Sequence, residues 1–344
     1  MRRPLIFCLT PVRNEAWILE LFLKCVSVWA DCIIIADQGS TDGSREIAQK
    51  FPKVTLIDNP SHELREAERQ QLLLKEARRT EDRKVLLALD ADEFLTANFL
   101  TSPEWESIIS APLGTVIRLE RPEIQTNASE LSFFCGPWDF PVGFVDDGSE
   151  HKGQTIHSFR IPVPPGCPIL APTEIKLMHY SLFDGDRFRS RIRWYQCFEY
   201  LTSNKKPIEL YRYYNWPLFL PPTAIKPVPK EWVNGYEERG INMSSANRDG
   251  SYRWDREVLR YFEQYGTAKF RRLAVWDVNW RQISSAFYPE EALQSFADPR
   301  TPAEKLVHRW LKRTQPYWSP DSRAGRGRKF VHRCIQRALR AVGW

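Results

Sequence analysis

The sequence predicts an α/β protein with a mixed sheet and flanking helices, followed by a mostly helical C-terminal region. Two observations support this fold class. Short apolar runs alternate with helical patterns over the first hundred residues, which is typical of strands joined by right-handed helical crossovers. Carboxylates also follow two of these apolar runs, at the sheet edge where open α/β sheets bind their ligands.

Four short apolar runs are the predicted strands, at residues 5–9, 32–36, 54–57 and 85–89. Each is bounded by polar residues, glycine or proline, as buried strands are. Helices are predicted between them at residues 15–29, where Ile18, Leu19, Phe22 and Val26 recur at helical spacing, and at the charged segment 63–79. This alternation favours a largely parallel sheet.

The loop at residues 37–43, Asp-Gln-Gly-Ser-Thr-Asp-Gly, follows the second predicted strand. Its glycines permit a tight turn, and Ser40 or Asp42 is expected to cap a helix that starts near Ser44. Taken alone, this segment is explained equally well as a capped loop without a ligand. Beside the carboxylates of the fourth strand, it becomes half of a predicted nucleotide pocket.

The segment 90–93, Asp-Ala-Asp-Glu, follows the fourth predicted strand. An Asp-x-Asp pattern is expected about once by chance in a chain of this length, so its position at a strand end carries the argument. Carboxylates there would bind a divalent cation that also contacts substrate phosphates. No dinucleotide-binding or Walker glycine motif follows the first strand, which leaves a metal to hold the phosphates.

Together these motifs resemble family 2 of the glycosyltransferases, enzymes of the GT-A fold. The resemblance rests on four segments, at residues 10–15, 36–43, 69–70 and 89–93. It covers residues 4–125 strongly and continues weakly to about residue 200. The Asp-Ala-Asp-Glu form, with His-Tyr-Ser at 179–181, is similar to the branch that elongates bacterial lipopolysaccharide cores and other surface glycans.

The resemblance implies a nucleotide-sugar site with a divalent metal, Mn²⁺ or Mg²⁺, and a UDP-sugar as the donor. Pro11, Arg13 and Glu15 would border the base and ribose, Asp37 would accept a hydrogen bond from the base, and Arg69 would lie near the base or diphosphate. Asp90 would hold the ribose or a metal-bound water, and Asp92 would ligate the metal. Gln38 stands where the family has a second Asp; because an amide also donates, the choice of base stays open.

An inverting sugar transfer also needs a carboxylate base within reach of the acceptor hydroxyl. In the resembling family this base follows the fifth strand, which here means the segment 139–174. That segment offers five carboxylates, Asp139, Asp146, Asp147, Glu150 and Glu174. Asp146 or Asp147 is the preferred base, although the segment 146–150 is also typical of a solvated turn.

His179 follows a strand-like apolar stretch. A late histidine completes the metal sphere in several GT-A enzymes, so the resemblance implies this role for His179. The alternative is a structural histidine that only makes hydrogen bonds.

The 344 residues leave room for about two domains. We expect a catalytic domain at 1–215, a proline-rich connection with a helical accessory region at 216–322, and a basic amphipathic tail at 323–344. Within the first, a helix is predicted at 187–201 with Arg189, Arg191 and Arg193. These cations would flank a diphosphate or an acidic acceptor, or form a solvated helix face.

The tail from residue 323 contains seven Lys or Arg and no acidic residue, whereas the rest of the chain is nearly neutral. Its apolar residues recur at helical spacing: Phe330, Val331, Cys334, Ile335, Leu339 and Val342. Such a basic amphipathic helix suits an anionic membrane surface. A disordered basic tail and an RNA-binding arm are the alternatives; no nucleic acid is expected as a partner.

No apolar run approaches 18 residues and no signal peptide precedes the first strand, so we expect a cytoplasmic protein, peripheral at the inner face of the membrane. The seven cysteines lack metal-binding or disulfide spacing. The expected function is a metal-dependent, inverting glycosyltransferase, a hexosyltransferase of polysaccharide biosynthesis that moves a sugar to a glycan or glycolipid. The alternative is a non-catalytic GT-A-like binding or scaffold protein docked on a membrane.

Overall fold

A computed structural model describes residues 3–59, 65–127, 130–154, 158–247, 252–289, 296–318 and 326–344. The chain divides into two compact units, Met1–Asp184 with Lys226–Asp249, and Gly185–Ile225 with Gly250–Trp344. This division differs from the predicted boundaries at 215 and 322. The chain leaves the first unit after Asp184 instead of after residue 215, and it returns to that unit at Lys226–Asp249.

The first unit is built on one mixed sheet, which has ten strands in the described part of the chain. The strands are β1 (Leu5–Val12), β2 (Cys32–Asp37), β3 (Val54–Asp58), β4 (Lys84–Ala88), β5 (Glu93–Leu95), β6 (Val116–Asn127), β7 (Glu130–Val145), β8 (Ile169–Leu170), β9 (Leu177–Leu182) and β10 (Lys226–Pro227). Their order is β3-β2-β1-β4-β7-β6-β9-β5, with β10 beside β7 and β8 beside β6. The predicted fold class, a mixed α/β sheet with flanking helices, is confirmed.

The strands β3, β2, β1 and β4 run parallel, and β7 joins them antiparallel to β4. They are the four predicted strands. The long β6–β7 hairpin has no counterpart among them, because charged residues interrupt the apolar run of β6 and glycines and prolines interrupt that of β7.

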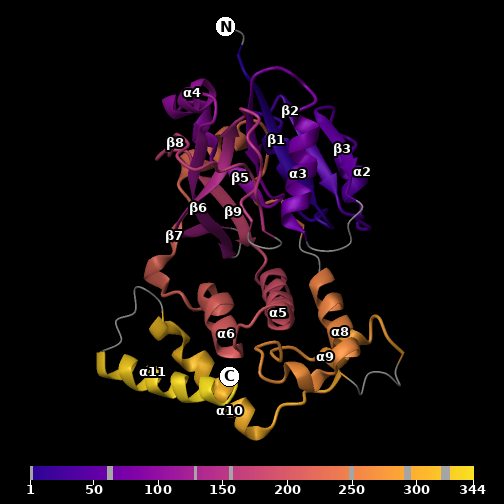
Figure 1. Ribbon diagram of the computed structural model, residues 1–344, viewed down its shortest axis with the longest axis vertical. Helices are drawn as coiled ribbons and strands as arrows, with labels where there is room; N and C mark the ends of the chain where they lie inside the picture. The colour runs from indigo at the N-terminus through magenta and orange to yellow at the C-terminus, as the bar shows by residue number, and fades with distance from the viewer. Residues whose placement is uncertain are drawn as a thin grey trace. The chain divides into compact units, whose positions relative to one another are not determined.

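Helices cover both faces of this sheet, and Figure 1 shows α3 in front of its parallel strands. They are α1 (Leu19–Val26), α2 (Ser44–Ala48), α3 (Glu66–Ala77), α4 (Pro103–Ser110) and α7 (Asn234–Glu237), with the 3₁₀ turns η1 (Ala97–Leu100) and η4 (Lys230–Trp232). Alternate residues of β1 explain the two layers. Ile6 and Cys8 join the core that contains α1, whereas Phe7 and Leu9 pack with α3. A strand buried on both faces is expected to be continuously apolar, as β1 is.

The two predicted helices of this unit are shorter than expected. The first, predicted at 15–29, is α1, since residues 15–18 form the turn that leads into it. The second, predicted at 63–79, is α3; its predicted first residues, 63 and 64, lie outside the described residues.

The second unit is helical, as predicted for the C-terminal region. Its helices are α5 (Gly185–Thr202), α6 (Pro207–Asn215), α8 (Arg253–Tyr265), α9 (Trp280–Ser284), α10 (Pro302–Thr314) and α11 (Arg326–Ala341), with 3₁₀ turns η2 (Trp216–Phe219), η3 (Pro222–Ala224), η5 (Thr267–Phe270) and η7 (Gln315–Trp318). None of the described helices is both long and apolar enough to span a bilayer.

The predicted amphipathic segment forms α11, and residues 323–325 lie outside the described residues. Phe330, Val331 and Ile335 of α11 are exposed, but the end of the chain is not a loose tail. Trp344 is buried in an apolar cluster of the second unit with Leu311. Removing this segment would therefore disturb the unit's core.

Candidate active site

The predicted binding loops meet at one edge of the sheet. Parallel pairing places Val12 opposite Asp37 and Leu9 opposite Ala88, so the carboxyl ends of β1, β2 and β4 lie side by side. Pro11 is buried at the end of β1 and Asp90 follows β4. Ligands of open α/β sheets bind at this edge.

The loops after β1 and β2 are joined by hydrogen bonds. The Asn14 amide donates to Ser40 Oγ (2.8 Å) and the Ala16 amide donates to Asp42 Oδ2 (2.9 Å). Asn14 has a φ of 56°, a left-handed conformation that asparagine tolerates. The predicted cap is found in part. The N-cap position is Gly43, which offers no side-chain cap, but Asp42 Oδ1 accepts a hydrogen bond from the amide of Ser44, the first residue of α2 (3.0 Å).

Asp37 ends β2 with a buried side chain. Its Oδ2 atom accepts hydrogen bonds from Arg45 Nη1 (2.8 Å) and the Ser40 amide (3.2 Å). Its Oδ1 atom is buried and has no hydrogen-bond partner within the described ranges. A buried acceptor without a partner is costly, and a ligand N–H that reached Oδ1 would remove that cost.

The other predicted nucleotide contacts surround this edge. Arg13 is half-buried after β1, and Glu15 accepts a hydrogen bond from Trp17 Nε1 at 2.7 Å. Arg69 lies on α3, half-buried, and its charge acts on Asp90. The geometry is therefore compatible with the predicted roles of these residues, which stay predictions.

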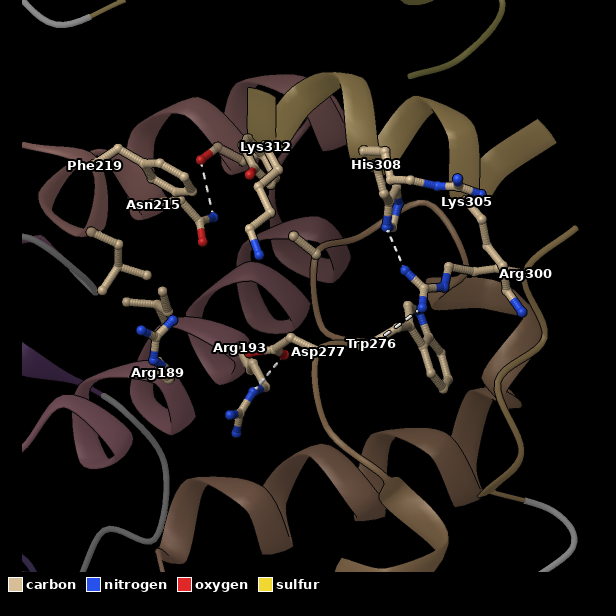
Figure 2. A pocket seen from close by; sticks show the side chains of 15 residues that line it. Arg189, Arg193, Asn215, Phe219, Trp276, Asp277, Arg300, Lys305, His308 and Lys312 are labelled. Atoms are coloured by element: carbon tan, nitrogen blue, oxygen red, sulfur yellow. Dashed lines mark hydrogen bonds and ion pairs between the residues drawn. The ribbon is translucent and has the colours of Figure 1, made fainter. Parts of the chain in front are cut away.

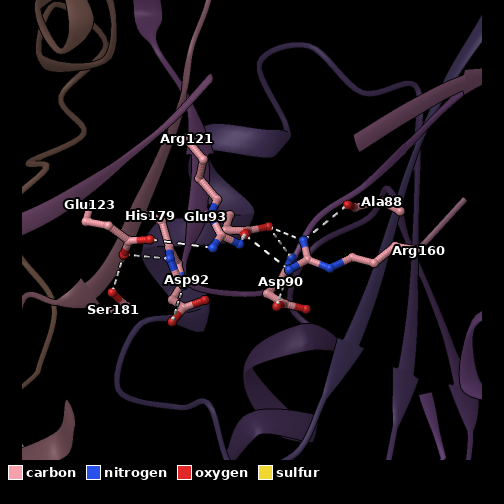
Figure 3. Close-up of polar contacts among 9 residues, drawn as sticks. All are labelled: Ala88, Asp90, Asp92, Glu93, Arg121, Glu123, Arg160, His179 and Ser181. Atoms are coloured by element: carbon pink, nitrogen blue, oxygen red, sulfur yellow. Dashed lines mark hydrogen bonds and ion pairs between the residues drawn. The ribbon is translucent and has the colours of Figure 1, made fainter. Parts of the chain in front are cut away.

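Arg160 holds two of the clustered carboxylates (Figure 3). Its Nη2 lies 2.6 Å from Asp90 Oδ2, and its Nη1 pairs with Glu93 Oε2. The Glu93 side chain is fully buried and also accepts from Arg121 Nη1 (3.3 Å) and the Asp90 amide (3.0 Å). Burial opposes its ionisation, but Arg160 and His179 lower the pKa of Glu93. Glu93 is thus an ionised structural carboxylate.

Asp92 faces a histidine instead of an arginine. Its Oδ2 lies 3.6 Å from His179 Nε2, and the other ring nitrogen, Nδ1, lies 2.8 Å from Glu123 Oε2. Ser181 Oγ donates to the same Glu123 oxygen. Figure 3 shows the three side chains in a row, Glu123, His179 and Asp92.

Strand register explains this row. His179 on β9 lies opposite Glu93 on β5 and Glu123 on β6, so three neighbouring strands bring these side chains together. Glu123, Arg121 and Arg160 were missed from the sequence. The one available signal was the alternation of charged residues at 121 and 123, which only the pairing of β6 with β9 connects to His179.

The electrostatics of the row favour a charged pair when no ligand is bound. Burial opposes ionisation of Glu123, but the charges of His179 and Arg121 lower its pKa to about 2. Burial likewise opposes protonation of His179, but Glu123 and Asp92 raise its pKa to about 9. Any cation that binds Nε2 must displace that proton.

The pair formed by Asp92 and His179 fits a divalent cation. Two atoms that each lie about 2.1 Å from one ion are at most about 4.2 Å apart, and Asp92 Oδ2 and His179 Nε2 are 3.6 Å apart. Glu123 then occupies the place of the carboxylate that orients many metal-binding histidines. Among the described residues no set of three or more His, Cys, Asp or Glu side chains is placed to hold a metal; Asp92 and His179 form a pair.

The preferred base residues do not lie at this edge. Val145 at the end of β7 pairs with Val85 near the start of β4, and the Asp146 amide donates to the Lys84 carbonyl. Asp146 and Asp147 therefore lie at the opposite edge, about 20 Å along the strand from Asp90. Asp146 is buried in an ion pair with Arg78 Nη2 at 2.7 Å, and Asp147 Oδ1 accepts from the Ser149 amide. This prediction was wrong, because β7, the strand before these residues, runs antiparallel to β4 and therefore ends at the opposite edge of the sheet.

Two other carboxylates of the predicted base segment are also engaged. Glu174 accepts from Ser102 Oγ at 2.5 Å, five residues before His179. Asp139 is paired with Arg118 Nε at 2.8 Å, and this contact lowers the pKa of Asp139. A lowered pKa makes a weaker base.

Comparison with known proteins agrees with the sheet edge described above. A family model described as Glycosyl transferase family 2 matches residues 8–102, which include most of β1, all of β2 to β5, and Asp37, Asp90 and Asp92. The predicted resemblance is thus found in this segment. No curated protein matches the chain.

The similar solved structures match only part of this chain. Glucosyl-3-phosphoglycerate synthase from Mycobacterium tuberculosis, in complex with Mn²⁺, UDP and glucosyl-3-phosphoglycerate, is 20% identical over 27% of this chain and 34% of that chain, with a TM-score of 0.21. Mannosyl-3-phosphoglycerate synthase from Rubrobacter xylanophilus is 15% identical over 37% and 42%, with a TM-score of 0.26. HddC from Yersinia pseudotuberculosis is 10% identical over 55% and 97%, with a TM-score of 0.34. The chain spans about a third to two fifths of the first two structures, and scores this low carry no argument about activity.

Proposed function

We propose that this protein is a metal-dependent glycosyltransferase that takes a sugar from a nucleoside-diphosphate sugar. The observation that carries the proposal is the row formed by Asp92, His179 and Glu123 at the carboxyl edge of the sheet. Asp92 belongs to the segment that matches the family 2 model, residues 8–102. The expected metal is Mn²⁺ or Mg²⁺, and the expected donor is a UDP-sugar.

In this proposal Asp92 and His179 hold the metal, and Glu123 orients His179. When bound, the metal would act as a Lewis acid that neutralises charge on the leaving diphosphate. Two protein ligands leave positions for phosphate oxygens and water, which suits Mg²⁺ and Mn²⁺ sites. Arg160 Nη2 holds Asp90 through an ion pair of 2.6 Å to Asp90 Oδ2. In this position Asp90 would contact the ribose or a metal-bound water.

Asp37 would select the base of the donor. Its Oδ2 atom is occupied by Arg45 and the Ser40 amide, and its Oδ1 atom is a buried acceptor without a partner in the described residues. A uracil N–H is one group that would satisfy it. Pro11, Arg13, Glu15 and Arg69 would line the remainder of the nucleotide site.

The proposed reaction is an inverting hexosyl transfer to a glycan or glycolipid of a bacterial surface polysaccharide, such as a lipopolysaccharide core. We place the protein at the cytoplasmic face of the membrane. This placement is supported by α11, whose exposed Phe330, Val331 and Ile335 lie among basic residues, a combination that binds anionic bilayers.

The test is turnover with a panel of nucleotide sugars. The purified chain, supplied with Mn²⁺ and single donors, should release the nucleoside diphosphate from one of them, and EDTA should stop the release. A chain that binds a nucleotide sugar but releases no diphosphate, with anionic glycolipid acceptors present, would instead support the non-catalytic alternative.

A further inference from the structure

The helical second unit contains a cavity of about 380 Å³ that the nucleotide-sugar site does not use. It is walled by α5, α6, α10 and the segment before α9, all within the second unit. Figure 2 shows Lys312 and His308 on α10, with Arg189 and Arg193 on α5. Its volume is in the range of pockets that bind small organic molecules, about 300–1,000 Å³.

The lining of this cavity is strongly cationic. Six cationic side chains contribute to it, and Asp277 is the one acidic residue among the lining residues: the cations are Arg189, Arg193, Arg300, Lys305, Arg309 and Lys312. Cations that converge on a concave surface with apolar walls concentrate anions from solution. The cavity is therefore a candidate site for an anionic ligand.

Two of these cations are already committed to the fold. Arg193 is buried and pairs with Asp255 (2.8 Å) and Asp277 (2.9 Å). Arg300 pairs with Asp298 at 2.9 Å and donates to the Trp276 carbonyl at 3.1 Å. These ion pairs largely neutralise the charge of Arg193 and Arg300 and hold both side chains in place in the lining of the cavity.

Three other cations have no such commitment. Arg189, Arg309 and Lys312 are exposed and make no hydrogen bond or ion pair with any residue of the described ranges. Lys305 makes only a long contact of 3.5 Å with Asp298. These four cations line one cavity, and their summed charge would attract an anion into it.

His308 adds rigidity without charge. Its Nδ1 lies 2.9 Å from Arg300 Nη1, which can only donate, and its Nε2 lies 3.2 Å from the Arg272 carbonyl, which can only accept. The ring must therefore be neutral, with its proton on Nε2. In this form it holds Arg300 at the cavity wall.

The remaining lining residues are mostly apolar or aromatic, and include Ile192, Tyr211, Leu218, Phe219 and Trp276. The ligand should therefore combine a doubly charged head with an apolar or ring-bearing part. A phosphate monoester fits, because it carries close to two negative charges at neutral pH and three acceptor oxygens. Guanidinium groups bind such oxygens in pairs.

We propose that this cavity binds an organic phosphate monoester, with Arg189, Arg309 and Lys312 on the phosphate and the aromatic wall on the organic group. The proposal concerns the second unit alone and does not depend on the glycosyltransferase function. The phosphate is either part of a soluble metabolite or the head group of a lipid, since both present the same chemistry.

The test is calorimetric titration of the full chain with phenyl phosphate, inorganic phosphate and dihexanoyl phosphatidic acid below its micellar concentration. Phenyl phosphate should bind at least tenfold more tightly than inorganic phosphate. The double variant Arg189→Gln, Lys312→Gln should lose at least tenfold in affinity. Tighter binding of the lipid would assign a head group, and tighter binding of phenyl phosphate a soluble ligand.

Two matched variants make the result specific. Arg313→Gln removes a neighbouring exposed cation of α10 that does not line the cavity, and it should leave phosphate binding unchanged. Asp92→Asn should also leave it unchanged, which separates this site from the nucleotide-sugar site. The proposal fails if the wild-type chain binds none of the three probes, or if Arg313→Gln weakens binding as much as the double variant.

Discussion

The Nδ1 atom of His179 lies 2.8 Å from Oε2 of Glu123, on the neighbouring strand of the sheet. This contact fixes which ring nitrogen faces Asp92. Because Nδ1 is engaged, Nε2 is the atom turned toward the Asp92 carboxylate at 3.6 Å. Glu123 therefore acts on a bound cation only through His179, and the two residues are expected to differ in how strongly they affect metal binding.

Glu123→Gln should weaken Mn²⁺ binding about 10- to 100-fold, the usual cost of losing a carboxylate that orients a metal-binding histidine. His179→Gln, which removes the proposed ligand, should weaken it at least as much. The measurement is Mn²⁺ affinity by electron paramagnetic resonance at fixed pH. If Glu123→Gln binds Mn²⁺ like the wild type, the orienting role is wrong.

Asp146→Asn should destabilise the fold and leave nucleotide binding unchanged. Asp146 is buried against Arg78 at the sheet edge opposite Asp90, and losing a hydrogen-bonded charge of this kind costs about 2 kcal/mol. Urea unfolding gives the free energy of unfolding, and UDP titration gives the affinity. A large loss of UDP affinity without a loss of stability would contradict this prediction and would indicate that Asp146 belongs to the nucleotide-sugar site.

Most of the residues at the carboxyl edge of the sheet, where the candidate site lies, could be predicted from the sequence. Because β1, β2 and β4 are continuous apolar runs, their ends, and with them Asp37, Asp90 and Asp92, were located from local patterns alone. The role of Arg160 could not be predicted in this way. It comes from a segment seventy residues after Asp90, and no local pattern connects the two.

The error at Asp146 has a physical cause. A residue that follows a strand lies at the binding edge only if that strand runs parallel to its neighbours, and β7 is antiparallel to β4. The contact between Glu123 and His179 could not be predicted for the same reason, because it depends on the pairing of β6 with β9. Strand order and direction are properties of the whole sheet, so neither relationship is visible in a single segment.

Stability of the second unit should fall in acid because of His308. Burial and the charge of Arg300 lower its pKa to about 4, below the unfolded value of about 6.5. The unfolded chain therefore binds a proton first, so His308 contributes fully above pH 6.5 and loses its contribution as the pH falls toward 4. The linked free energy is roughly 3 kcal/mol.

The check on His308 is the difference in unfolding free energy between the wild type and His308→Gln at several pH values. That difference should shrink between pH 6.5 and 4, because glutamine keeps a donor and an acceptor but does not titrate. A difference that stays constant over this range would contradict a lowered pKa for His308.

Exposed apolar residues of α11 should be needed for membrane binding. Phe330 is 67% exposed and Ile335 is 38% exposed, so the double variant Phe330→Ser, Ile335→Ser should lose at least tenfold in binding to anionic vesicles, given about 25 cal/mol per Å² of apolar surface. Leu306→Ser, at a 63% exposed position on α10, is the control. Vesicle co-sedimentation measures both, and equal binding by all three proteins would exclude α11 as the anchor.

The central claim is that Asp92 helps to hold the metal on which donor binding depends. The most direct measurement is UDP affinity with and without Mn²⁺ for the wild type, Asp92→Asn and, as a control, Asp146→Asn. Mn²⁺ should strengthen UDP binding to the wild type and to Asp146→Asn, and should have no effect on Asp92→Asn, whose fold is kept because the substitution preserves volume. An equal Mn²⁺ effect in Asp92→Asn and the wild type would contradict the claim.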